Sequence, residues 1–231
     1  MLLRIEGLRV RYGGITALSG ISIDVPAGET VLLVGANGAG KSSTINAIIG
    51  LVPADGGRIV FDGKDIGTLP CERRARLGIG YSPEGRRVFQ SLTVTDNVLA
   101  GAFGLGRRRQ QEALTWLRSV FPLLTERANQ PAGQLSGGQQ QIVALSRAMA
   151  SFPRLLLLDE PFLGLAPVWI QQISAAILQL RARGTTVLMT EQMARPALKL
   201  ATRGYVMRGG EVRRSGSVAE IRDLALAQEY L

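Results

Sequence analysis

The fold is decided by the stretch Gly35-Ala36-Asn37-Gly38-Ala39-Gly40-Lys41-Ser42, which has the pattern GxxxxGK[ST]. The residues before it, Thr30–Val34, are apolar and β-branched, which predicts a short buried strand. The residues after it, Ser42–Ile49, predict a helix. Strand, tight loop and helix are the context that this pattern requires, so we interpret the stretch as a phosphate-binding loop.

The residue types of this phosphate loop match that chemistry. Glycines let backbone N–H groups turn inward on phosphate oxygens, and the helix N-terminus adds its positive dipole end. Lys41 supplies a cation for the β- and γ-phosphates, and the Ser42 hydroxyl can ligate Mg²⁺. The alternative is a glycine-rich turn that binds no nucleotide. The predicted nucleotide-binding residues here are Gly35, Asn37, Gly38, Ala39, Gly40, Lys41, Ser42 and Ser43.

A second motif ends in two acids. Leu155–Leu158 predicts a buried strand, and Asp159 and Glu160 follow it directly. Carboxylates at the C-terminal edge of a parallel sheet lie where such folds bind ligands. We expect Asp159 to hold Mg²⁺, directly or through water, and Glu160 to accept a proton from an attacking water or to orient it. By itself the pattern also fits a buried strand that ends in an acid.

The third motif is Leu135-Ser136-Gly137-Gly138-Gln139, called the signature segment below. Its hydroxyl and its exposed backbone N–H groups at a helix start form another phosphate-binding arrangement. An ordinary capped helix is the alternative, because serine is a favoured N-cap residue.

The rest of the chain predicts one α/β domain. Strands dominate the first third, helical periodicity runs over 93–124, and Gly137–Gly138 precede a helix that extends to Ala150. A helix over Val168–Arg183, a strand over 185–189, a helix over 194–201 and a closing hairpin over 204–213 follow. We therefore expect a core over 1–83 and 148–231, with a largely helical insertion over 84–147 that carries the signature segment.

The amino-acid composition of the chain excludes several classes of protein. The 231 residues are 46% apolar and carry a net charge of +9, one cysteine (Cys71) and no histidine. A single cysteine excludes an internal disulfide framework and fits a reducing cytoplasm. The sequence contains no run of about 18 apolar residues, the length that a membrane span needs. The basic balance allows an anionic partner, but the cluster Arg107–Arg109 is not interleaved with aromatic residues as a nucleic-acid surface would be.

Along the chain, the phosphate loop, the signature segment and then the strand that ends in two acids resemble the motifs of the ATPase subunits of ABC transporters, across essentially the whole chain. The resemblance implies a P-loop NTPase (RecA-like) core with an antiparallel β subdomain and an inserted α-helical subdomain. It implies ATP and Mg²⁺ as ligands. It also implies a head-to-tail pair in which Ser136, Gly137, Gly138 and Gln139 of one subunit complete the ATP site of the other. Tyr12 is expected to stack on adenine, with a core tyrosine as the alternative.

Three residues depart from the family pattern. Glu84 stands where the family usually has a glutamine that touches Mg²⁺, and Gln192 stands where it usually has a histidine facing the γ-phosphate. A carboxylate can still ligate Mg²⁺, and glutamine can donate a hydrogen bond to phosphate. Phe162 stands in place of a serine, in a loop that crosses the dimer interface in the family. Neither of the first two changes demands loss of activity.

The segments Pro83–Phe89, Glu191–Gln192, Gly164–Pro167 and Tyr230–Leu231 resemble one ATPase of branched-chain amino acid (Liv-type) importers, to which urea and short-amide importers are close. This implies a peripheral subunit on the cytoplasmic face of the inner membrane. Its expected partners are a second, histidine-bearing ATPase or a second copy of itself, two permeases and a solute-binding protein. We expect the permeases near Pro83–Leu92, through Arg86, Arg87 and Phe89, although these also fit a basic surface turn.

Two other function classes remain as alternatives. A non-hydrolysing regulatory subunit is suggested by the missing histidine, although Glu160 is retained. A soluble ABC-type ATPase acting on nucleic acid is allowed by the charge. Such proteins usually carry two ATPase units or a long coiled-coil insertion, and the sequence shows neither, so we expect no nucleic-acid partner.

Overall fold

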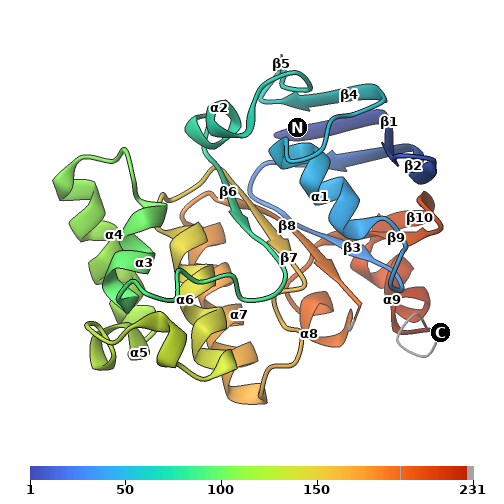
Figure 1. Ribbon diagram of the computed structural model, residues 1–231. Helices are drawn as coiled ribbons and strands as arrows, with labels where there is room; N and C mark the ends of the chain where they lie inside the picture. The colour runs from blue at the N-terminus through green and yellow to red at the C-terminus, as the bar shows by residue number, and fades with distance from the viewer. Residues whose placement is uncertain (193, 228–231) are drawn as a thin grey trace.

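A computed structural model describes residues 1–192 and 194–227 of the chain (Figure 1). Tyr230 and Leu231, two of the residues that resemble branched-chain importers, lie outside the described residues. Among the described residues, no helix has the length and apolar character needed to cross a bilayer.

The centre of the molecule is a six-stranded sheet in which four of the five strand pairings are parallel. In spatial order its strands are β10 (Glu211–Ser217), β9 (Arg203–Arg208), β3 (Thr30–Val34), β8 (Thr186–Glu191), β7 (Leu155–Asp159) and β6 (Ile79–Ser82). Every residue of β3, β7 and β8 is buried, as expected for strands covered on both faces. Only β10 runs antiparallel to its neighbour, so it forms an antiparallel edge.

A second, antiparallel sheet covers one face of this central sheet. Its strands, in spatial order, are β2 (Ile15–Val25), β1 (Leu3–Tyr12), β4 (Gly56–Phe61) and β5 (Lys64–Asp65). Figure 1 shows it at the upper right, with α1 (Lys41–Ile49) between the two sheets. Inward-facing residues of β1 and β2 form one core cluster with α1 and with one face of β3 and β7.

Helices cover the other face of the central sheet and extend away from it. They are α3 (Val94–Gly101), α4 (Arg107–Val120), α5 (Leu123–Glu126), a 3₁₀ turn (Ala132–Gln134), α6 (Gly137–Met149), α7 (Pro167–Ala182), α8 (Ala194–Leu198) and α9 (Val218–Ala227). Figure 1 shows α3, α4, α5 and α6 together at the left, beside the sheet. A second core cluster joins these helices to the opposite face of β3, β7 and β8.

Most predicted elements are observed, with shifted ends. The strand predicted at Thr30–Val34 has the predicted bounds. The predicted closing hairpin is β9 and β10, paired antiparallel. The helix predicted to reach residue 201 is wrong at its end, because α8 stops at Leu198. Arg107, the first residue of the basic cluster, begins α4. The fold is the predicted mixed α/β class, whereas the subdomain boundaries at 84 and 147 stay a prediction.

One element that the sequence analysis missed is α2 (Cys71–Arg76), which has no apolar periodicity. It is held by Arg74, whose side chain is only 3% exposed. The Arg74 guanidinium donates to the carbonyl oxygens of Ala47 and Ile48, at the end of α1, at 2.6 and 2.8 Å. A single arginine therefore caps the C-terminus of α1 and fixes α2 beside it.

Candidate functional site

Three strand ends bring the predicted site residues together. Because β3, β8 and β7 are parallel neighbours, their carboxyl ends meet at one edge of the sheet. The phosphate loop follows β3, and Glu160 follows Asp159 at the end of β7. Gln192 follows β8 and is half-buried. The topology thus gathers segments that are more than a hundred residues apart in the sequence at the edge where α/β sheets bind ligands.

Lys41 is the centre of this edge. Its side chain is 4% exposed, and its ammonium donates to the Gly35 carbonyl at 2.8 Å and to the Ala36 carbonyl at 3.3 Å. Its Nζ also lies 3.0 Å from Oε1 of Glu160, whose side chain is 6% exposed. The cation predicted to bind phosphate and the acid predicted to act on water therefore form a buried ion pair.

Two glycines of the phosphate loop are required by close packing. A Cβ on Gly35 would overlap the carbonyl oxygen of Met207, and Gly40 has a φ of +100° with Leu18 2.7 Å from a Cβ position. Gly38, in contrast, has a φ of +78° and nothing within 4 Å. The base of the loop is thus packed against the protein, while its tip at Asn37 and Gly38 is exposed. Ser43, in the first turn of α1, is half-buried.

Two oxygen ligands of the predicted Mg²⁺ site lie next to each other. The Ser42 hydroxyl donates to Oδ1 of Asp159 at 3.1 Å, and the Thr190 hydroxyl donates to the same oxygen at 2.6 Å. Burial raises the pKa of Asp159, while the two hydroxyl bonds act in the opposite direction. A hydroxyl and a carboxylate that converge beside the phosphate loop fit a hard cation that prefers oxygen. Thr190 is a site residue that the sequence analysis missed.

The backbone of Glu160 is in a rare conformation. Its φ is +46°, in the left-handed region that non-glycine residues seldom adopt. Its N–H donates to the carbonyl oxygen of Thr190 at 3.2 Å and to the Thr190 hydroxyl at 3.1 Å. Such a conformation costs about 1–3 kcal/mol and persists only where surrounding contacts hold it. The turn that aims Glu160 is therefore maintained by the neighbouring strand β8.

In the part of the chain that the structure describes, Glu84 is not joined to the oxygen ligands that meet beside the phosphate loop. Its side chain is exposed, and its carbonyl oxygen accepts a bond from the Arg87 side chain at 3.3 Å. Among the described residues, no hydrogen bond or ion pair joins the Glu84 carboxylate to Ser42 or Asp159. A role for Glu84 in binding Mg²⁺ thus stays a prediction.

Tyr12 ends strand β1 at the tight turn that leads into β2, and it is 44% exposed. The core-tyrosine alternative is therefore wrong. An exposed ring beside a glycine turn leaves a face free for stacking, so the structure permits the adenine contact without testing it.

The signature segment starts α6, and both of its interpretations fit. The Ser136 hydroxyl accepts a bond from the Gln139 N–H at 3.5 Å, and the Gln139 side chain accepts one from the Ser136 N–H at 3.0 Å, which is a capping box. Ser136 itself is exposed. No hydrogen bond or ion pair between described residues joins this segment to the phosphate loop, so within one chain they are separate features.

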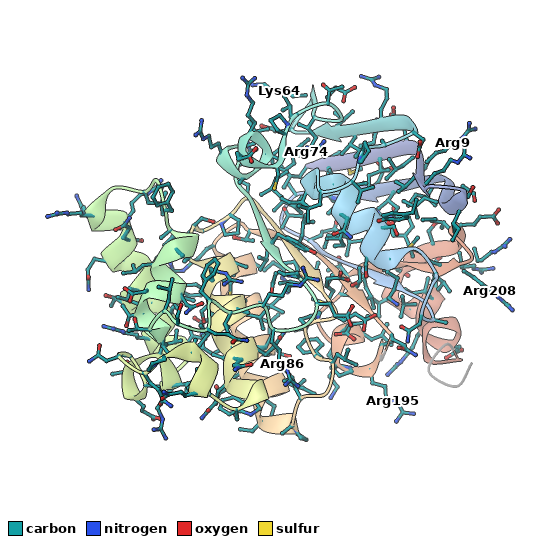
Figure 2. The ribbon with its side chains drawn as sticks, viewed as in Figure 1. Arg9, Lys64, Arg74, Arg86, Arg195 and Arg208 are labelled. Carbon is teal, nitrogen blue, oxygen red and sulfur yellow. The ribbon has the colours of Figure 1, made fainter. Side chains whose placement is uncertain are left out.

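Arg86 lies directly against the signature segment (Figure 2). A Cβ on Gly137 would overlap the Arg86 guanidinium, and a Cβ on Gly138 would lie 2.7 Å from Nε1 of Trp169. Arg86 also has a φ of +65°. We expected Arg86 at a permease contact, and no local pattern indicated that it would cover a signature glycine.

Phe162 packs inward. Its side chain is 3% exposed and belongs to the core cluster under the helices, and its N–H donates to Oε1 of Glu191 at 3.0 Å. The phenylalanine that replaces the family's serine therefore fills core space in this chain.

Glu191 is the second missed residue, because an acid at the end of a strand carries no signal of its own. It is 1% exposed, and burial raises its pKa from 4.5 to about 8. Glu160 adds to this increase, while Lys41 and the backbone N–H groups of Phe162 and Gln192 oppose it. The folded chain thus keeps a proton on Glu191 that the unfolded chain loses.

We expect Glu191→Gln to gain stability relative to wild type as the pH rises. Between pH 4.5 and about 8 only the folded wild type binds this proton, so its free energy of unfolding falls as the pH increases through that window. The variant has no proton to lose there. Urea unfolding of both proteins at pH 6 and pH 8.5 measures the effect. A stability difference that is the same at both pH values would contradict it.

Known proteins share both sequence and fold with this chain. The family model described as ABC transporter matches residues 18–163. The chain is 46% identical, over 91% of each protein, to the high-affinity branched-chain amino acid transport ATP-binding protein BraG of Pseudomonas aeruginosa. It is 39% identical to the lipopolysaccharide export system ATP-binding protein LptB of Acidithiobacillus ferridurans, over 96% of this chain and 92% of that protein.

Solved structures agree. A nucleotide-free ATP-binding cassette from an ABC transporter superposes with a TM-score of 0.87 at 30% identity, over 98% of this chain and 95% of that one. The dimeric structure of MJ0796, a bacterial ABC transporter cassette, gives a TM-score of 0.85 at 25% identity, over 94% and 99%. Phosphate loop, acids and signature segment thus occur on the matching fold, and the chain belongs to the ABC transporter family as an ATP-binding, ATP-hydrolysing subunit.

Proposed function

We propose that this chain hydrolyses ATP to drive an importer of branched-chain amino acids, or of another small amino acid or amide such as urea. The similarity to BraG carries the substrate class, because it covers 91% of both proteins. The similarity to LptB makes an export system the competing substrate assignment. Under the proposal the subunit works on the cytoplasmic face of the membrane with two permeases and a solute-binding protein.

The site geometry supports a defined order of events. The Lys41 ammonium is paired with Glu160 at 3.0 Å. ATP phosphates offer Lys41 a stronger anionic partner, and they bring their own hydrogen bonds from the loop N–H groups. When Lys41 turns to phosphate, the Glu160 carboxylate is released to accept a proton from water. Under the proposal, the ion pair with Lys41 keeps the Glu160 carboxylate from accepting a proton until phosphate replaces it as the partner of Lys41.

The other residues have complementary roles in the proposal. Ser42 and Asp159 would hold Mg²⁺, which would supply positive charge to neutralise the charge that develops on phosphate during hydrolysis. Gln192 would donate to the γ-phosphate or orient the water. Ser136–Gln139 of a second ATPase subunit would complete the site, which fits their separation from the phosphate loop and the dimer seen for MJ0796. Hydrolysis would open the pair and move the permeases.

Uptake in cells tests this proposal. A strain that lacks the chain is complemented with wild type or with Lys41→Ala, and uptake of labelled leucine and urea is measured. We expect the wild type to restore uptake of one of these solutes and the variant to restore none, because removing the ammonium removes its contact with phosphate. Uptake equal in both strains would contradict the proposal. Restored lipopolysaccharide export without any uptake would assign the chain to an exporter.

We expect Tyr12→Ala to weaken ATP binding by about 5- to 150-fold, since stacking of a base on an aromatic ring contributes about 1–3 kcal/mol. Ile15→Ala is the matched control, because Ile15 lies across the same turn and is 74% exposed. Titration with a fluorescent ATP analogue measures both variants. Equal affinities for the two variants would remove Tyr12 from the site.

A further inference from the structure

The Glu191 carboxyl is a buried polar group for which the proposed chemistry has no use. It stands at the end of β8, with 1% of its surface exposed. Its Oε1 accepts a hydrogen bond from the backbone N–H of Phe162 at 3.0 Å, and the N–H of Gln192 also donates to it. Glu191 therefore connects the Gln192 segment with the loop that follows Asp159 and Glu160.

That loop needs support, because it starts from a rare backbone conformation. Glu160 has a φ of +46°, and its backbone N–H donates a hydrogen bond to the Thr190 hydroxyl. Phe162 is only two residues further on, so the bond to Glu191 closes the same turn from its other end. Two successive residues of β8, Thr190 and Glu191, thus hold the turn at both ends.

A third bond reaches the turn from the signature helix. Gln141 on α6 is 4% exposed, and its Nε2 donates to the carbonyl oxygen of Pro161 at 3.3 Å. Gln141 lies one helical turn after Gly137, on the helix that the signature segment begins. The segment from Glu160 to Phe162 is therefore fixed between β8 and the signature helix.

We propose that Glu191 is a positioning residue for ATP hydrolysis: its bond to the Phe162 N–H, together with the bond from Gln141 to Pro161, holds Glu160 in its working direction. Neither side chain touches nucleotide in this assignment. The inference rests on the proposed role of Glu160 and adds two residues that support it. It also gives one chain a direct connection between its signature helix, which serves the partner's nucleotide, and its own hydrolytic acid.

The test compares Glu191→Leu with the conservative variant Glu191→Gln. Leucine removes the acceptor for Phe162 N–H, whereas glutamine keeps an acceptor oxygen. We expect kcat for MgATP to fall about 10- to 100-fold in Glu191→Leu, the usual loss when an orienting partner is removed. We expect Glu191→Gln to stay within about threefold of wild type. KM for MgATP should stay within about twofold in both, since the phosphate loop is unchanged.

A second variant keeps the test decisive if Glu191→Leu fails to fold. Gln141→Met removes the donor to Pro161 at similar side-chain length, and we expect a smaller fall in kcat with KM unchanged. Thermal unfolding of each variant shows that the fold is retained. The proposal is overturned if folded Glu191→Leu and Gln141→Met both hydrolyse MgATP at the wild-type rate, or if Glu191→Gln is as slow as Glu191→Leu. Absence of turnover in the wild-type chain would instead refute the proposed function.

Discussion

Glu160→Gln lowers kcat for ATP hydrolysis by about 10²- to 10⁴-fold, the range that a positioned general base contributes. The amide has nearly the same shape as the carboxylate but cannot take a proton from water. Nucleotide binding should persist, because the phosphate loop keeps Lys41 and Ser42. Steady-state hydrolysis and equilibrium binding of MgATP, measured on the same preparation, separate these two effects.

The ion pair between Lys41 and Glu160 leads to a second expectation for Glu160→Gln. In the nucleotide-free variant the Lys41 charge keeps its carbonyl partners, Gly35 and Ala36, but loses its carboxylate. We expect its free energy of unfolding to drop by about 1–3 kcal/mol. MgATP then supplies the missing anion, so the increase in melting temperature on adding MgATP should exceed that of wild type. Background-level hydrolysis that is equal in wild type and Glu160→Gln would support the non-hydrolysing regulatory subunit, in which Glu160 has no catalytic role.

Lys41→Met should be more damaging to the nucleotide-free chain. The methionine fills similar space, but Glu160 is left buried without its cation. Breaking a buried pair from one side costs about 3–5 kcal/mol, because the remaining charge is uncompensated. ATP binding and hydrolysis should both be lost, since the Lys41 ammonium is the cation that the phosphate loop holds beside Glu160.

A double variant shows whether this cost comes from the pair. In Lys41→Met/Glu160→Gln neither charge remains, so we expect most of the lost stability to return while hydrolysis stays absent. Urea unfolding of wild type, both single variants and the double variant measures the coupling energy. Additive losses, with the double variant the least stable of the four, would contradict a direct interaction between the two side chains.

The sequence predicted well where one local pattern determined the structure. The β-branched run Thr30–Val34 has no competing periodicity. Ser136, the N-cap residue of α6, forms a capping box with Gln139, three residues further on. Strand β2 was missed because Gly20 and several polar residues interrupt its alternation, and its pairing with β1 contains register shifts. Helix α2 was missed because Arg74, rather than an apolar face, holds it in place.

Within the site, sequence predicted which residues matter but not how they pair. That Lys41 contacts Glu160 depends on the spatial order of β3, β8 and β7, which no local pattern contains. Thr190 and Glu191 matter because they accept hydrogen bonds from the turn that follows β7, and no local pattern around them indicates those contacts. The motif residues were readable because phosphate chemistry restricts them to particular types at a fixed spacing.

The guanidinium of Arg86 resting on Gly137 has a consequence for assembly. It gives the signature face an exposed cation that forms no ion pair among the described residues. If two such subunits approach head to tail, this cation meets the other subunit's phosphate loop, which carries a lysine of the same sign. A nucleotide polyanion bound between the two faces would attract both cations, so its binding would favour contact between the subunits. Because salt screens this attraction, dimer formation should weaken as the salt concentration rises.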